Sequence, residues 1–235
     1  MSKVFGNQIN NFLLKVCEKE EYAKDLKAGK LYMKESGYFR KLEDNYRGDY
    51  NDGKIPIKSD LVKYNKLDNS SERFSEVFPG VKVVLQAGFQ GDDKIPIFCS
   101  TLFNEKILQG VYKKGEHKVY QFKSSYINEM RRFGKYMVVF RLDELISKLK
   151  DENAIGDVVS YWKIEELYGL RNINTSHNYR QFFNKDIAYQ NQNEYRILIP
   201  DSKLIEKNKD FHILSVGELV TARIFETMNI EGIEF

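Results

Sequence analysis

The sequence predicts a single α+β domain over residues 1–235, built on a mixed or mostly antiparallel sheet. Short runs rich in β-branched and aromatic residues follow one another along the chain, and such runs are typical of strands. The segments between them lack the regular helical spacing of βαβ units, which disfavours a doubly wound parallel sheet. The chain has only four prolines and no stretch rich in Gly and Ser, so no linker divides it.

The first expected element is an amphipathic helix over residues 8–28, which stops at Gly29. Its apolar residues fall near one helical stripe; they are Ile9, Phe12, Leu13, Val16, Ala23 and Leu26. Strands are expected over 30–33, 81–85, 95–103, 137–140, 157–162, 194–199 and 211–214. Two further helices are expected over 143–149 and 217–228.

Composition predicts a soluble, folded protein of the cytoplasm. Hydrophobic residues make up 42% of the chain and charged residues 30%, which is a globular balance. No apolar run reaches the roughly 18–20 residues that cross a bilayer, and the N-terminal residues lack the apolar region and cleavage site of a secretory signal. Two cysteines, Cys17 and Cys99, provide no disulfide framework. We therefore expect no membrane partner.

Common metal and phosphate sites lack sequence support. The three histidines are far apart and have no Cys-x-x-Cys partner, which disfavours a zinc site. Neither a P-loop nor a Rossmann glycine pattern occurs. The segment that starts at Asp49 is similar to a calcium loop, but its glycine stands at the fifth position and the bidentate Glu is missing. The sequence therefore predicts no metal site, and a net charge of +3 predicts no nucleic-acid partner by itself.

A row of polar residues marks the strand expected over 194–199. Side chains alternate along a strand, so Gln192, Glu194 and Arg196 are expected on one face, opposite an apolar face that anchors the strand in the core. A carboxylate and a guanidinium in one row suit a ligand that offers a ribose hydroxyl and an anionic or carbonyl group. The alternative is a structural Glu194–Arg196 ion pair on a solvated sheet face.

A second polar segment, residues 32–53, combines arginines with aromatic residues. Two arginines, Arg40 and Arg47, beside Tyr38 and Phe39 could hold a pyrophosphate and stack on a planar base. The alternative is a solvated helix face, because Arg40 has acidic residues three and four positions later.

The sequence Gln192-Asn-Glu194 resembles the Q-x-E element of ADP-ribosyltransferases. The wider pattern is similar to a family of bacterial and phage proteins with ADP-ribosyltransferase-like folds, which includes toxins of phage-defence systems. The motifs that carry this resemblance are Gly29-Lys-Leu-Tyr-Met33, Tyr38-Phe-Arg40, Arg47-Gly-Asp49, Asp52-Gly53 and Phe183-Asn-Lys185, followed by Gln192-Asn-Glu194-Tyr-Arg-Ile197.

The resemblance implies a split β-sheet core with an N-terminal helix and peripheral helices. It also implies an enzyme that uses NAD as substrate, needs no metal, and transfers ADP-ribose to a macromolecular acceptor, either nucleic acid or protein. Glu194 would contact the ribose and Gln192 would position the accepting nucleophile. The implied cofactor contacts are Arg40 or Arg47 at the diphosphate, Tyr38 or Tyr32 against nicotinamide or ribose, and Arg196.

Two other functions fit part of the same pattern. Asp186, Glu194 and Arg196 loosely imitate the acidic pair and basic residue of a nuclease, which would need Mg²⁺. A non-catalytic module of phage or mobile-element origin, which binds a nucleotide or a protein, is the other alternative.

Overall fold

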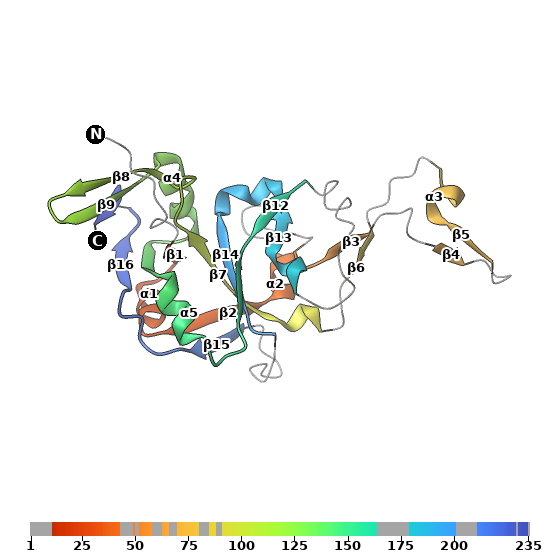
Figure 1. Cartoon of the computed structure of the whole chain (residues 1–235), viewed down its shortest axis with the longest axis horizontal. Helices are drawn as coiled ribbons and strands as arrows, with labels where there is room; N and C mark the ends of the chain where they lie inside the picture. Colours follow the sequence, from red (N-terminus) through yellow and green to blue (C-terminus); the bar gives the residue numbers. More distant parts are fainter. Residues whose placement is uncertain are drawn as a thin grey trace. The chain divides into compact units, whose positions relative to one another are not determined.

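The computed structural model describes residues 11–42, 49, 52–57, 63–65, 70–79, 85–87, 91–163, 179–200, 211–228 and 230–234. It confirms the α+β class, with a mostly antiparallel sheet (Figure 1). The chain forms two compact units. Unit 1 consists of Met1–Glu35, Lys94–Val159 and Gln190–Phe235, and unit 2 consists of Ser36–Asp93 and Ser160–Tyr189. The single domain expected over 1–235 stays a prediction.

Unit 1 contains the main sheet and three helices of the described chain. Its strands are β1 (Phe12–Cys17), β2 (Lys30–Glu35), β7 (Pro96–Leu102), β8 (Leu108–Lys114), β9 (His117–Phe122), β10 (Tyr136–Arg141), β11 (Ile155–Val158), β14 (Glu194–Leu198), β15 (Phe211–Ser215), β16 (Arg223–Glu226) and β17 (Gly232–Glu234). Its helices are α1 (Glu20–Lys27), α4 (Ser124–Phe133) and α5 (Leu142–Lys148). None of these helices has both the length and the apolar character that crossing a membrane requires.

The main sheet of unit 1 divides at β7. One edge of β7 pairs with β14, from Ile97 opposite Leu198 to Thr101 opposite Glu194. On the other edge, β1 pairs near Thr101 and β2 pairs near Ile97, so two branches leave the same strand. One branch continues through β10 to β16, and the other continues to β15. The sheet is therefore antiparallel and split.

Lys15 lies at the division between the branches. Its ammonium donates a hydrogen bond of 2.6 Å to the carbonyl oxygen of Cys99, which lies between the β1 and β2 pairings of β7. The same ammonium lies 5.1 Å from the centre of the Phe98 ring. A side-chain donor thus satisfies a backbone acceptor at the point where the sheet opens.

Hydrophobic clusters cover both faces of the β1–β10 branch. On one face, α1 and α5 contribute Ala23, Leu26 and Leu145 to a cluster that contains Leu13 and Phe140. On the other face, residues of α4 and of the β8–β9–β17 sheet pack against Leu14, Met137 and Val139; they are Tyr126, Ile127, Met130, Tyr120, Phe122 and Ile233. The central branch is therefore a buried layer between two others.

The helix predicted over 8–28 is wrong in its first half. Residues Phe12–Cys17 form β1, and α1 begins only at Glu20; residues 8–10 lie outside the described chain. Leu13 and Leu14 are both buried because β1 pairs with β7 and β10 and has a cluster on each face. An apolar run buried on both faces has no alternation, so its periodicity alone does not distinguish a strand from a helix.

The helix predicted over 217–228 is also wrong. This segment contains β16, which pairs with β10 from Val139 opposite Arg223 to Tyr136 opposite Glu226. Most of the other predicted elements agree with the structure, but 157–162 forms β11 and β12 rather than one strand. The β8–β9 hairpin and α4 were not predicted, and most of the strand expected over 81–85 lies outside the described residues.

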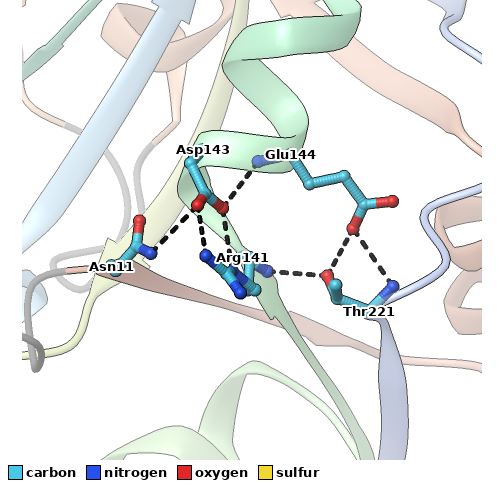
Figure 2. A network of polar contacts seen from close by, with 5 residues as sticks. All are labelled: Asn11, Arg141, Asp143, Glu144 and Thr221. Atoms are coloured by element: carbon cyan, nitrogen blue, oxygen red, sulfur yellow. Dashed lines mark hydrogen bonds and ion pairs between the residues drawn. The ribbon is translucent and has the colours of Figure 1, made fainter.

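Polar contacts hold the loop before β16 against α5 (Figure 2). The Glu144 carboxylate accepts hydrogen bonds from the backbone N–H groups of Val220 and Thr221 and from the Thr221 hydroxyl. The Thr221 hydroxyl oxygen in turn accepts from the Arg141 N–H at 3.0 Å. Asp143 accepts from the Arg141 guanidinium and from Asn11.

In its described residues, unit 2 contains short elements and several buried polar side chains. Its helices are α2 (Ser36–Lys41) and α3 (Phe74–Val77), and Arg180–Phe183 forms a 3₁₀ turn. Its described strands form three pairs: β3 (Ile55–Ile57) with β6 (Leu85–Ala87), β4 (Lys63–Asn65) with β5 (Ser71–Arg73), and β12 (Ser160–Trp162) with β13 (Asn184–Asp186). The β12–β13 pair is parallel, so the chain as a whole is mixed.

Candidate functional site

Strand β14 places Glu194 and Arg196 on one face, as the alternation predicts. Arg196 Nε donates to Glu194 Oε1 at 2.7 Å, and Arg196 Nη2 donates to Oε2 at 3.3 Å. Both side chains are buried: Glu194 is 5% exposed and Arg196 is fully enclosed. The ion pair is therefore not on a solvated sheet face. On the opposite face of β14, Tyr195 and Ile197 join the hydrophobic cluster, as expected.

Gln192 does not continue this row. It ends a 3₁₀ segment, Ile187–Gln192, and β14 begins only at Glu194. Asn193, between them, has a left-handed backbone conformation with φ of 47°. The predicted strand alternation fails here because a strand requires negative φ at each position. The row of three polar side chains is thus reduced to the Glu194–Arg196 pair.

Strand β7 supplies the residues opposite this pair. Thr101 is paired with Glu194 and Cys99 with Arg196, and directly paired residues share a face of the sheet. Burial raises the pKa of the Cys99 thiol well above its ordinary value, and the nearby negative charge of Glu194 raises it further. The thiol is therefore protonated at neutral pH, which argues against Cys99 as a nucleophile.

The strand register also places Tyr32 on this sheet face. Lys34 is opposite Ile97, Ile97 is opposite Leu198, and residues two apart on a strand share a face. Tyr32 is 49% exposed, and its ring stacks on Phe211 with centres 5.1 Å apart. The Lys34 ammonium lies 5.6 Å from the Tyr32 ring centre. This half of the sheet face thus carries an accessible aromatic ring near a cation.

Arg40 and Tyr38 belong to α2 in unit 2. Arg40 Nη1 donates to the Asp52 carbonyl oxygen at 2.7 Å, and Arg40 Nη2 pairs with Asp93. The Arg40 side chain is nearly buried, whereas the Asp93 side chain is 73% exposed. Tyr38 makes an edge-to-face contact with Phe39, at 5.8 Å between ring centres. Arg47 lies outside the described residues.

Unit 2 also brings two distant motifs together. Asp49 Oδ2 accepts a hydrogen bond of 3.2 Å from the backbone N–H of Asp186, and the Asp52 N–H donates to the Asp49 carbonyl oxygen. Asp49 and Asp52 are both buried. Gly53 has φ of 69°, and a Cβ there would lie 2.6 Å from the Phe182 ring. Asp49 and Gly53 thus lie against Asp186 and Phe182, the two residues that flank the motif 183–185.

A lysine and a tyrosine that the sequence reasoning did not select lie in the same part of unit 2. Lys185 is buried, and its ammonium is 5.3 Å from the Tyr189 ring centre. Burial is the main cause that raises the pKa of Tyr189, and the negative charge of Asp49 is the second. The four-residue spacing of Lys185 and Tyr189 was visible in the sequence, but the proximity of Tyr189 to Asp49 was not.

The candidate residues are thus distributed over both units. Tyr32, Gln192, Glu194 and Arg196 belong to unit 1, and Tyr38 and Arg40 belong to unit 2. Within the described ranges, no group of three or more His, Cys, Asp or Glu side chains is arranged to hold a metal ion. Comparisons of the chain with protein-family models, curated proteins and solved structures found no match.

Proposed function

We propose that the chain is an ADP-ribosyltransferase-like enzyme that acts in conflict between phage and host. It would cleave the nicotinamide–ribose bond of NAD and transfer ADP-ribose to a macromolecular acceptor, nucleic acid or protein. The observation that carries the proposal is the Glu194 carboxylate, buried at the start of β14 and held by Arg196 at 2.7 Å. The Q-x-E pattern and the split antiparallel sheet support it.

The proposed reaction needs a fixed negative charge near the ribose. Loss of nicotinamide develops positive, oxocarbenium-like charge on the sugar. A carboxylate in a buried setting interacts with that charge more strongly than one in water, and a carboxylate already oriented needs no reorganisation during the reaction. Arg196 supplies this orientation through two contacts with Glu194. The more distant oxygen, Oε2, is the one that we assign to the ribose 2′-hydroxyl.

The other residues take the roles that the resemblance implies for them. Tyr32, with its exposed ring, is assigned to packing on nicotinamide or ribose; Tyr38 is the other candidate for this contact. Arg40, or Arg47, is assigned to the diphosphate. Because the Asp52 carbonyl oxygen and Asp93 both bind Arg40, a diphosphate would replace Asp93, the exposed partner of the ion pair. Gln192 is assigned to the accepting nucleophile.

The test is incubation with NAD labelled in its adenine part, together with a cell lysate. Free nicotinamide is measured, and the label is followed into separate protein and nucleic-acid fractions. We expect the wild type to release nicotinamide and to label one fraction, and Glu194→Gln to lose at least about 99% of both signals. Glu105→Gln, which changes an exposed carboxylate of the same unit, is the matched control.

Glu194→Gln keeps an amide oxygen that can accept from Arg196, so a folded variant is expected; a thermal melt verifies it. Near wild-type transfer by that variant would refute the proposal. Cleavage of nucleic acid that stops with a chelator would favour the Mg²⁺-dependent nuclease instead. Stabilisation by NAD or another nucleotide without turnover would favour a binding module.

A further inference from the structure

We propose that Asn193 is a positioning residue that sets the orientation of Gln192 relative to Glu194. The catalytic consequence rests on the proposed function, but the geometric claim can be tested without activity. In an uninterrupted strand, the residues at 192 and 194 would project side by side. Here Gln192 ends a 3₁₀ segment and Glu194 begins β14, so the backbone of Asn193 determines how the two side chains diverge.

The conformation of Asn193 is unusual for a buried residue. Among the described residues, three that are not glycine have positive φ: Asn153, Tyr179 and Asn193. Asn193 is 3% exposed, whereas Asn153 is exposed and lies in the same unit. Asparagine tolerates the left-handed region better than most residues do, but the surrounding contacts must hold it there.

Hydrogen bonds from the end of β7 provide that restraint. Asn193 Nδ2 donates to the Leu102 carbonyl oxygen at 2.6 Å, and the Leu102 N–H donates to the Asn193 carbonyl oxygen at 2.9 Å. Asn193 Oδ1 accepts from Asn104 Nδ2 at 2.7 Å. The side-chain amide therefore uses both its donor and its acceptor, which fixes the side chain together with the backbone.

Gln192, the residue before Asn193, is hydrogen-bonded to the same strand, β7. The Thr101 hydroxyl donates to the Gln192 carbonyl oxygen at 3.1 Å, and Thr101 is also paired with Glu194. The backbone from Gln192 to Glu194 is thus bound to two consecutive residues of β7. Because a misplacement of about 1 Å in a reacting group can cost on the order of 100-fold in rate, loosening this turn should affect catalysis.

The experiment compares four single variants. Asn193→Ala removes the amide and penalises the left-handed backbone, and Asn193→Gly removes the amide but permits that backbone. Asn104→Ala removes one hydrogen bond and leaves residue 193 unchanged. Asn153→Ala is the matched control, because it imposes the same backbone penalty at an exposed site. Amide hydrogen exchange, melting temperature, and kcat and KM for nicotinamide release are measured for each.

For Asn193→Ala, we expect the Leu102 and Asn193 amides to exchange at least about tenfold faster than in the wild type. We expect kcat to fall about 10- to 100-fold with KM changed less than about threefold. Asn193→Gly and Asn104→Ala should show smaller changes of the same kind. Asn153→Ala should lower the melting temperature through the backbone penalty alone, yet leave kcat and both exchange rates within about twofold.

The two proposals fail in different ways. If the wild type releases no nicotinamide, the proposed function fails, and the exchange rates still decide the role of Asn193. Unchanged exchange at Leu102 and Asn193 in Asn193→Ala would overturn the positioning role. In an active enzyme, equal kcat for Asn193→Ala and Asn153→Ala would overturn it as well.

Discussion

At the scale of single residues, the buried pair of Glu194 and Arg196 has two consequences that differ in kind. The pair orients a carboxylate, and it also encloses two charges that water would otherwise solvate. Removing one partner leaves the other charged and buried, which is costly, whereas replacing both by apolar groups is often neutral. The pair is therefore weak evidence for stability in itself, but each member depends on the other.

We predict that Arg196→Met destabilises the folded protein by about 3–5 kcal/mol, because it leaves the Glu194 carboxylate without its guanidinium. Glu194→Gln should cost less, about 1.5–3 kcal/mol, since its amide oxygen still accepts from Arg196. Urea unfolding of Glu194→Leu, Arg196→Met and the double variant Glu194→Leu/Arg196→Met measures the coupling between the two residues. A double variant as unstable as the sum of the single changes would contradict this account.

At the scale of elements, the same residue types can point to different structures depending on the neighbouring strands. Residues 12–17 are apolar at nearly every position, which suits a helix or a strand buried on both faces. Contacts with β7 and β10, distant in sequence, decide for the strand. In contrast, α5 could be predicted, because its one-sided pattern is local.

We predict that the folded protein loses stability in acid, because protonation of Glu144 weakens its contacts with the loop before β16. Burial opposes ionisation of this carboxyl, but hydrogen bonds from Thr221 and Val220 outweigh it and lower its pKa. A carboxyl whose folded pKa lies below its unfolded value of about 4.3 stabilises the protein above that pH. The contribution is lost as the pH falls through the folded pKa. It should be small, because the carboxyl is close to solvent.

Urea unfolding between pH 7 and pH 3 checks this prediction. Glu144→Gln should be less stable than the wild type at pH 7, and the difference should shrink as the pH falls below about 4. Glu105→Gln, an exposed change, serves as the control. An equal difference at both ends of the pH range would show that Glu144 acts only through its shape and neutral hydrogen bonds.

At the scale of the whole molecule, unit 1 is assembled from three separate stretches of chain. Where the chain leaves it at Glu35 and returns at Lys94, the two side chains form an ion pair of 2.8 Å. Where the chain leaves at Val159 and returns at Gln190, the Val159 N–H donates to the Glu194 carbonyl oxygen. The chain thus re-enters unit 1 close to each point of exit.

We predict that unit 1 folds without residues 36–93 and 160–189, when short glycine linkers replace them. Both hydrophobic clusters consist of unit 1 residues, and closing short loops costs little entropy. Thermal melting followed by circular dichroism, with amide dispersion by NMR, measures the outcome. A shortened chain without cooperative unfolding would instead support the single domain that the sequence predicts over 1–235.

Many residues of the candidate site could be predicted from the sequence, but their geometry could not. The alternation at 194–199 correctly predicted that Glu194 and Arg196 share a face and that Tyr195 and Ile197 enter the core. It failed at Gln192, because hydrogen bonds from Leu102 and Asn104 hold Asn193 in a left-handed conformation. Such contacts join residues about ninety positions apart, so no local pattern contains them.

The amino-acid sequence alone determined the α+β class, most strands of the eight-stranded main sheet, and the acidic and basic residues that one strand face presents. These properties are local, because side-chain alternation and backbone preference act over a few residues. Only the tertiary structure decided that residues 12–17 form a central strand, that the sheet divides at β7, and that the Glu194–Arg196 pair is buried. Burial and strand pairing depend on which distant segments meet, and that is settled by the packing of the whole chain.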